Sequence, residues 1–180
     1  MANNNIVFEK AVGQDYQAVY SLTAARVRWM DQVGIQQWNV TNYLEAYPAA
    51  YYEEQQKKSC LYVLKDSDGT VIGGLVLLGQ DDRWADRRED AALYIHNLVT
   101  APSEKGAGNI ILQEVENLAK KQGVAYLRLD CAVDNAFLNR YYEDHGFQLA
   151  GSCSEGLYVG NRREKKIVQK IIIKEADHEA

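Results

Sequence analysis

One short segment of the chain places a positive charge and two glycines at the start of a predicted helix. Residues 105–108 read Lys-Gly-Ala-Gly, and apolar residues at helical spacing follow from Ile111 to Ala119. Amides at a helix N-terminus favour anions by about 0.3–1 kcal/mol per charge, and glycines let the backbone approach a ligand closely. Lys105 adds a mobile cation. The segment therefore predicts a phosphate-sized anion site, with an ordinary strand-to-helix turn as the alternative.

A second segment places an amide and a phenol on one helix face. Asn135 and Tyr142 are separated by helical spacing, with Asp134 as the expected N-cap. Gly146 ends this helix, so Tyr142 lies in its last turn, close to the following strand. A tyrosine hydroxyl is protonated at neutral pH and can act as a proton donor. The alternative is that Tyr142 is a half-buried packing residue.

Other phosphate-binding motifs fit the glycine segment less well. The Gly-x-x-x-x-Gly-Lys-Ser/Thr pattern of a P-loop is absent. A dinucleotide fingerprint is closer, because Gly106 and Gly108 precede a helix and Asp130 ends the next strand about twenty residues later. Its third glycine position is Ile111, however, and the unit follows a β-hairpin. An NAD-dependent oxidoreductase is therefore the weaker interpretation.

Hydrophobic periodicity predicts the elements that position these groups. Alternating apolar residues indicate strands, apolar residues at three and four indicate helices, and an Asp-Gly pair at 68–69 favours a hairpin turn. The order predicts an α/β fold of the α+β type with a mixed sheet. In chain order we expect strand Ile6–Ala11, helix Asp15–Val33, one or two helices in Tyr43–Lys58 around Pro48, strands Cys60–Lys65 and Thr70–Gly79, a charged loop Gln80–Asp90, the strand–helix–strand–helix block Tyr94–Phe147, and strands Gln148–Ser152 and Lys166–Lys174.

Composition limits the class of protein. The 180 residues, 47% hydrophobic and 25% charged, fit one soluble domain spanning 1–180. A net charge of -5 argues against a nucleic-acid partner. Three widely spaced cysteines fit reduced thiols and predict neither a disulfide framework nor a metal site. The N-terminal residues lack a signal-peptide pattern and no apolar run is long enough to cross a bilayer, so we expect a cytoplasmic protein with no membrane partner.

Taken together and in order, these pieces resemble the GNAT superfamily of acyl-CoA-dependent N-acetyltransferases. The resemblance rests on Leu98-Val99-Thr100 at a strand end, on Lys105–Gly108, and on Asn135 through Tyr142 to Gly146-Phe147. It implies three layers with a central, mostly antiparallel mixed sheet. It also implies acetyl-CoA as cofactor and transfer of its acetyl group to a primary amine of a small molecule or protein. A homodimer is compatible with this resemblance.

The resemblance also implies roles for individual residues. An alkyl amine is neutral only about once in 2,500 molecules at pH 7, so a base or a desolvating pocket must help it attack a thioester. His96 is the candidate base, with a water-mediated route as the alternative, and Tyr142 is the candidate acid toward the departing thiolate. No metal ligand is implied. The candidate cofactor-binding residues are Leu98, Val99, Thr100, Lys105, Gly106, Ala107, Gly108, Asn109 and Asn135.

One departure concerns the glycine loop. Family members have Arg or Gln, two residues, Gly, one residue, then Gly or Ala. With Lys105 in the basic position and Gly108 in the last one, three steps replace five. The loop then looks about two residues short. A non-catalytic acyl-CoA-binding or sensing module of the same fold is therefore the alternative function.

The acceptor is expected to enter near the first helices and the hairpin loops, where aromatic residues are frequent. Most of these rings are expected to be packing residues. Arginines interleave with the acidic residues of Gln80–Asp90, so this segment is expected to be a solvated loop. The aromatic residues concerned are Trp29, Trp38, Trp84, Tyr43, Tyr47, Tyr51 and Tyr52.

Overall fold

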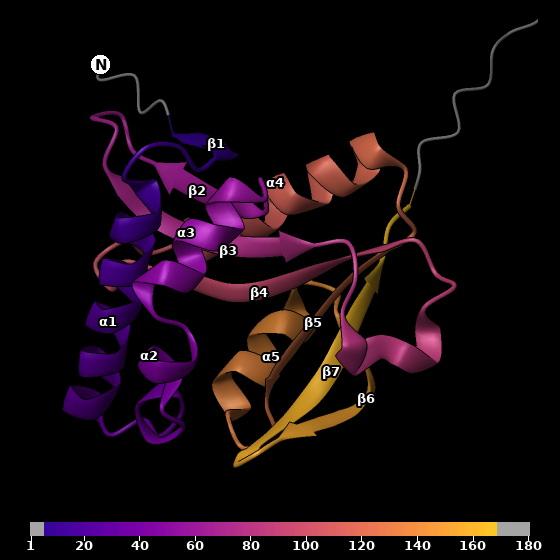
Figure 1. Ribbon diagram of the computed structural model, residues 1–180. Helices are drawn as coiled ribbons and strands as arrows, with labels where there is room; N and C mark the ends of the chain where they lie inside the picture. The colour runs from indigo at the N-terminus through magenta and orange to yellow at the C-terminus, as the bar shows by residue number, and fades with distance from the viewer. Residues whose placement is uncertain (1–5, 169–180) are drawn as a thin grey trace, which may run out of the picture.

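The computed structural model describes residues 6–168, which form one seven-stranded sheet with helices on both faces (Figure 1). The chain first forms β1 (Val7–Lys10), α1 (Asp15–Val33), the 3-10 turn η1 (Trp38–Val40), α2 (Tyr43–Ala46), α3 (Ala49–Lys57), β2 (Leu61–Lys65) and β3 (Val71–Leu78). It continues through the 3-10 segment η2 (Asp82–Arg87), β4 (Ala92–Thr100), α4 (Ala107–Gln122), β5 (Tyr126–Ala132), α5 (Ala136–Asp144), β6 (Gln148–Glu155) and β7 (Tyr158–Lys166).

The sheet is mixed, with a single parallel pair among its described strands. The strand order is β1-β2-β3-β4-β5-β7-β6, and all neighbours are antiparallel except β4 and β5. That parallel pair extends only from Ala92 opposite Tyr126 to Tyr94 opposite Arg128. Beyond it the two strands diverge toward their carboxyl ends (Figure 1). The predicted mixed, mostly antiparallel sheet is confirmed.

Two apolar cores lie on opposite faces of the sheet and make three layers. One core joins α4 and α5 to the sheet through Ile111, Val115 and Tyr142. The other joins α1 and α3 to it through Val19 and Tyr52. The helices approach β3 closely because it contains Gly73 and Gly74: a Cβ there would lie 2.8 Å from the Ile111 side chain and 2.7 Å from that of Val19. Larger residues at these two positions would push the layers apart.

Most predicted elements are present, with two notable differences. Helix α1 has the predicted bounds, and Gly34 ends it with φ at +72°. Pro48 divides the predicted Tyr43–Lys58 segment into α2 and α3, since a proline ring and missing N–H favour a helix start. The last described strand is Tyr158–Lys166, which was not predicted. Most of the predicted strand Lys166–Lys174 lies outside the described residues. No helix within 6–168 is long and apolar enough to span a membrane.

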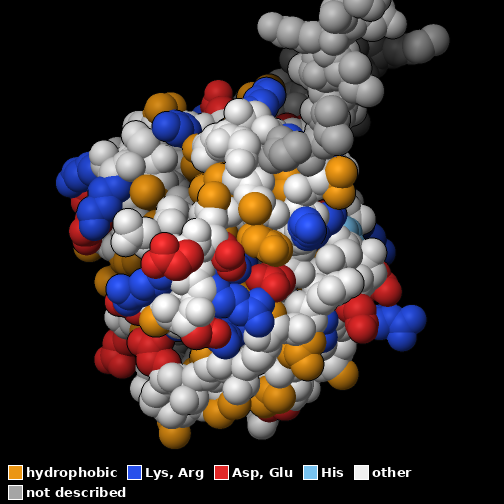
Figure 2. All heavy atoms as spheres, turned by 90° about the vertical axis from the view of Figure 1, so that its right-hand side faces the viewer, with side chains coloured by type: hydrophobic (Ala, Val, Ile, Leu, Met, Phe, Trp, Pro, Cys, Tyr) orange, Lys and Arg blue, Asp and Glu red, His pale blue; other side chains and the backbone are white. Residues whose placement is uncertain are grey.

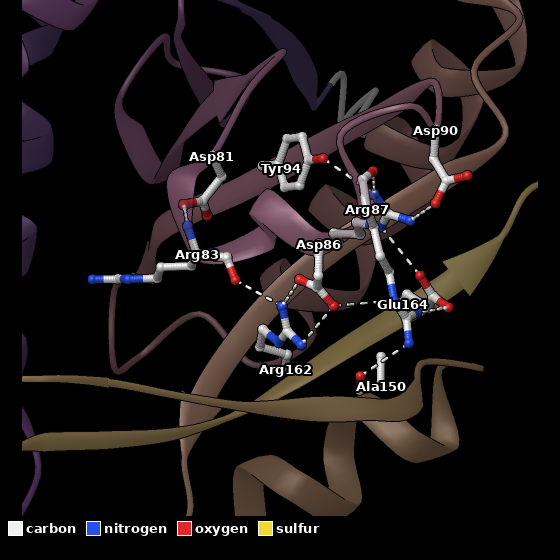
Figure 3. Close-up of polar contacts among 10 residues, drawn as sticks. Asp81, Arg83, Asp86, Arg87, Asp90, Tyr94, Ala150, Arg162 and Glu164 are labelled. Atoms are coloured by element: carbon white, nitrogen blue, oxygen red, sulfur yellow. Dashed lines mark hydrogen bonds and ion pairs between the residues drawn. The ribbon is translucent and has the colours of Figure 1, made fainter.

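The prediction of a solvated loop at Gln80–Asp90 holds in part: most of its residues are exposed, but the segment forms η2 and is anchored to the sheet. Trp84 is fully buried, and the Arg128 guanidinium lies 4.9 Å from its ring centroid. Arg162 bonds Asp86 and the Arg83 carbonyl, and Arg87 bonds Glu164 at 2.5 Å (Figure 3). Acidic and basic side chains consequently interleave over this face of the molecule (Figure 2). The segment is therefore held by one of its own arginines, Arg87, and by Arg128 and Arg162 of the sheet.

Candidate active site

A cavity of about 1370 Å³ lies where β4 and β5 separate. Its lining comes from both sides of the sheet: α1 and the η1–α2 segment contribute from one side, and α4 and α5 from the other. Of the eleven predicted site residues, ten line this cavity. They are His96, Leu98, Val99, Thr100, Lys105, Gly106, Gly108, Asn109, Asn135 and Tyr142.

The strand that borders the cavity contains a bulge at Asn97. Gly74 of β3 pairs with Val99 of β4, and Val76 pairs with His96. One residue of β3 therefore lies opposite two residues of β4, Asn97 and Leu98. Asn97 takes up the extra residue with φ at +53°, a conformation that asparagine tolerates better than most residues. The bulge resets the alternation of faces, so that Leu98 packs toward the α4 core and Val99 toward the α1 core. A bulge leaves backbone groups outside the ladder, where they can face a ligand.

His96 is paired with the carboxylate of Asp81, the N-cap of η2. Its Nε2 lies 3.0 Å from Asp81 Oδ2, and both side chains are largely buried. Asp81 also accepts a 2.9 Å hydrogen bond from the Arg83 amide. Burial acts to raise the pKa of Asp81, but the bonds to His96 and to the Arg83 amide outweigh it and lower that pKa. Asp81 therefore remains charged and holds the imidazole in place.

Tyr142 lies in the last turn of α5 and is 8% exposed. Its ring packs edge-on against Phe147, with centroids 5.8 Å apart. Burial raises the pKa of Tyr142 far above the usual value for a phenol. The hydroxyl is therefore a hydrogen-bond donor throughout the neutral range, at the edge of the cavity.

The glycine segment forms the N-terminus of α4. Gly106 is the N-cap with φ at +87°, and the helix begins at Ala107. Within residues 6–168 the amides of Gly106 and Gly108 have no hydrogen-bond partner, which suits an anion site. Ala107 does not fit its predicted role: its side chain is buried in the core, and its amide donates to the Glu104 carbonyl at 3.3 Å.

This geometry changes the interpretation of the loop length. Because Gly106 is the N-cap of α4 and Gly108 lies in its first turn, these two glycines fill both glycine positions of the family pattern. The basic position, three residues earlier, is then Ser103. All six positions of the family pattern are therefore present in the loop. The loop differs from the pattern in lacking a basic residue at the first position, and not in its length. Gly108 has a further constraint, since a Cβ there would lie 2.8 Å from the Tyr141 hydroxyl.

Asn135 has a structural task that the sequence did not indicate. It, and not Asp134, is the N-cap of α5, because its Oδ1 accepts from the Leu138 amide at 2.9 Å. Its Nδ2 donates to Gln37 Oε1 at 2.8 Å. Both ends of this side chain are therefore used within the protein, where they connect α5 to the segment that follows α1.

Several cavity residues were not predicted from the sequence. Asp130, at the end of β5, accepts hydrogen bonds from Arg83 at 3.1 Å and from the Tyr158 hydroxyl at 2.6 Å. Arg83 also bonds Glu155. These residues come from four segments, so no local spacing could have indicated them. They give this end of the cavity two carboxylates, Asp130 and Glu155, against one arginine.

The predicted aromatic residues divide between the cavity and the core. Trp29, Trp38, Tyr43 and Tyr47 line the cavity, and Trp38 stacks on Tyr43 at 4.3 Å. In contrast, Trp84 and Tyr52 are fully buried. Rings in this position can contact the apolar part of an acceptor.

The chain belongs to the acetyltransferase (GNAT) family, whose sequence profile matches residues 32–147. The predicted family is thus confirmed, and with it an acetyltransferase of the class that uses acetyl-coenzyme A. Among curated proteins, the chain is 23% identical over 155 residues to the uncharacterized N-acetyltransferase YesJ of Bacillus subtilis, covering 83% of this chain and 85% of YesJ.

Solved structures show the same fold. A GNAT-family acetyltransferase from Listeria monocytogenes has a TM-score of 0.74 at 21% identity, covering 89% of this chain and 94% of that one. The PaiA N-acetyltransferase of Thermoplasma acidophilum, solved in complex with coenzyme A, has a TM-score of 0.68 at 21% identity, with 90% and 99% covered. At these identities the likeness concerns the fold.

Proposed function

We propose that this protein transfers an acetyl group from acetyl-coenzyme A to a primary amine of a small molecule or a protein. The proposal rests on three groups from different elements that line the same cavity. His96 on β4, Tyr142 on α5 and the Gly106–Gly108 amides of α4 all line one cavity where the sheet opens. A base, an acid and an anion site are the groups that acetyl transfer requires.

The residues present fit the cofactor. The free amides of Gly106 and Gly108, with Lys105 beside them, suit its diphosphate. A volume of about 1370 Å³ accommodates a long cofactor together with an acceptor. When bound, the cofactor supplies an activated acetyl group as a thioester. The bulge at Asn97 interrupts the ladder beside the cavity, and the Leu98 amide would there be the donor that stabilises negative charge on the thioester oxygen.

His96 takes up the proton that the attacking amine must lose. The Nε2 side of its ring faces Asp81, which leaves Nδ1 as the accepting nitrogen. Asp81 fixes the ring and stabilises the imidazolium as it forms, as a carboxylate does beside a catalytic histidine. The carboxylates of Asp130 and Glu155 attract an ammonium group to the same end of the cavity.

Tyr142 acts on the leaving side. Its hydroxyl donates to the sulfur as the carbon–sulfur bond breaks, so that coenzyme A departs as a thiol. Because burial raises the pKa of Tyr142, the hydroxyl is always protonated when the step begins. The amine proton therefore goes to His96, and the thiol receives its proton from Tyr142.

The proposal is tested by measuring free thiol released from acetyl-coenzyme A with a panel of primary amines, including amino-terminal peptides. Amine-dependent release, with the acetylated amine identified by mass spectrometry, is the expected result. Thermal shift with coenzyme A and NAD tests binding separately, since a ligand at 100 times its Kd stabilises by about 2.7 kcal/mol. Coenzyme A binding without turnover of any amine would favour the non-catalytic sensing module.

A further inference from the structure

Arg26 projects from α1 into the same cavity, at the end of β4. Its Nη2 donates to the Thr100 carbonyl at 2.6 Å and contacts the Thr100 hydroxyl at 3.2 Å. Its guanidinium carbon lies 4.9 Å from the centre of the Trp29 ring. The side chain is therefore held in one place by two neighbours before any ligand binds.

The guanidinium has no counterion in the described part of the chain. Arg83, Arg128 and Arg162 each form an ion pair with a carboxylate, whereas no described acidic residue pairs with Arg26. Its Nε and Nη1 donors have no hydrogen-bond partner there either. Half-burial consequently lowers the pKa of Arg26. A partly desolvated charge without a partner is costly, and most are found paired. An anionic ligand would supply that partner.

The loop between β4 and α4 has no net positive charge with which to bind an anion. Thr100 ends β4, and the loop from 101 to 106 leads from it to the free amides at the start of α4. This loop contains Lys105 and Glu104, so its formal charge is zero. Figure 1 shows α1 beside the end of β4, and the Arg26–Thr100 hydrogen bond places them in contact. Arg26 thereby brings a positive charge to this loop from a position 74 residues before Thr100 in the sequence.

We propose that Arg26 binds the diphosphate of coenzyme A, together with the Gly106 and Gly108 amides. A guanidinium presents paired N–H donors that match phosphate oxygens, and such charge-assisted bonds are the stronger ones. The inference rests on the proposed function only for the identity of the ligand. It concerns binding, so it can be tested whether or not turnover is found.

The experiment compares Arg26→Gln, Arg26→Lys and Arg28→Gln with the unaltered protein. Arg28 is an exposed arginine of the same helix that does not line the cavity, which makes it a matched control. Dissociation constants are measured by calorimetry or by thermal shift for three probes. Coenzyme A carries both a diphosphate and a 3′-phosphate, 3′-dephospho-coenzyme A carries only the diphosphate, and pantetheine carries neither.

Arg26→Gln is expected to weaken binding of coenzyme A and of dephospho-coenzyme A alike, by at least tenfold, with no change for pantetheine. Arg26→Lys keeps the charge and loses the paired donors, so a loss of about threefold is expected. Arg28→Gln should match the unaltered protein. An equal loss of affinity for all three probes would mean that Arg26 only holds Thr100. A loss of affinity limited to coenzyme A would place Arg26 at the 3′-phosphate. Either result overturns the proposal.

The unaltered protein separates this inference from the proposed function. If it binds none of the probes, both fail. If it binds coenzyme A and Arg26→Gln binds equally well, only the role of Arg26 fails. Should Arg26→Gln melt well below the unaltered protein, Arg26→Lys serves as the test, with the same contrast between dephospho-coenzyme A and pantetheine.

Discussion

The side-chain amide of Asn97 donates a 2.6 Å hydrogen bond to the Tyr43 hydroxyl and so ties the bulge of β4 to α2. Its Oδ1 accepts from Tyr51 of α3 at 2.9 Å. One residue at positive φ thus connects the strand beside the proposed thioester position to two helices on the acceptor side.

Replacing Asn97 separates its backbone role from its side-chain role. Asn97→Gly keeps the positive φ and loses both hydrogen bonds, while Asn97→Ala loses both bonds and is strained. We expect Asn97→Ala to be less stable than Asn97→Gly by up to about 1 kcal/mol in urea unfolding. Turnover should be highest in the unaltered protein, lower in Asn97→Gly and lowest in Asn97→Ala. Equal stability of the two variants would show that the φ of residue 97 is not a constraint.

Tyr142→Phe is expected to reduce turnover at least tenfold and to leave the Kd for coenzyme A nearly unchanged. Removing a positioned acid commonly costs about 10²–10⁴ in rate. Tyr141→Phe is the matched control, because its hydroxyl bonds Asn109 at 2.9 Å. Steady-state kinetics and calorimetry check both values. A greater loss of turnover in Tyr141→Phe would assign the acid to that residue.

His96→Gln should lower the rate at pH 7 by tenfold or more, and the deficit should shrink toward pH 9. The reason is that, below the amine pKa of about 10.4, the neutral fraction of the amine rises about tenfold with each unit increase in pH. At higher pH a catalytic base is therefore needed less. The pH–rate profile measures this. His145→Gln, which alters a histidine outside the main cavity, should give the profile of the unaltered protein. A deficit independent of pH would contradict the role of His96 as base.

Arg128→Met is expected to destabilise the protein by about 2–3 kcal/mol. Arg128 is fully buried and pairs with Asp90 and Glu164, which would lose their common partner. Arg140→Met removes an exposed pair with Asp144 and should cost less than about 0.5 kcal/mol. Urea unfolding compares the two. Similar small losses for both would show that η2 is held by its apolar contacts alone.

Cys131 should react with iodoacetamide far more slowly than Cys60 at pH 8. Burial raises the pKa of the Cys131 thiol to about 11, so about one molecule in 1,000 is thiolate at pH 8. The neutral thiol is favoured in the fold, and this contribution to stability is complete below the unfolded pKa of about 8.5 and lost as pH rises toward 11. Peptide mapping by mass spectrometry measures labelling. Equal rates for the two cysteines in the folded protein would contradict the burial of Cys131.

The elements that could be predicted are those with a local cause. The bounds of α1 follow from its periodicity and from Gly34, and the β2–β3 hairpin follows from the turn at Asp66–Gly69, where the Gly69 amide donates to the Asp66 carbonyl. Strand β7 was missed because it reads as a run of charges. Those charges meet partners from distant segments: Arg162 pairs with Asp86, and Lys165 with Glu116.

The site divides in the same way. Tyr142 and the Gly106–Gly108 amides belong to short motifs and could be predicted from spacing. Asp130 and Arg26 reach the cavity, and Asp81 reaches His96 beside it, only through the packing of β5, α1 and the start of η2. The local sequence around these residues does not indicate contacts between such distant segments, so the tertiary structure was needed to find them.

The short contact between β4 and β5 also leaves two strand edges in the middle of the sheet. Past Tyr94 and Arg128 the sheet has two additional edges in its middle, with backbone donors and acceptors unclaimed by a neighbouring strand. Edges of this kind usually recruit strands from other molecules. Here residues of both strands line the cavity. The chain thus leaves at the cavity backbone groups that a continuous sheet would have paired with another strand.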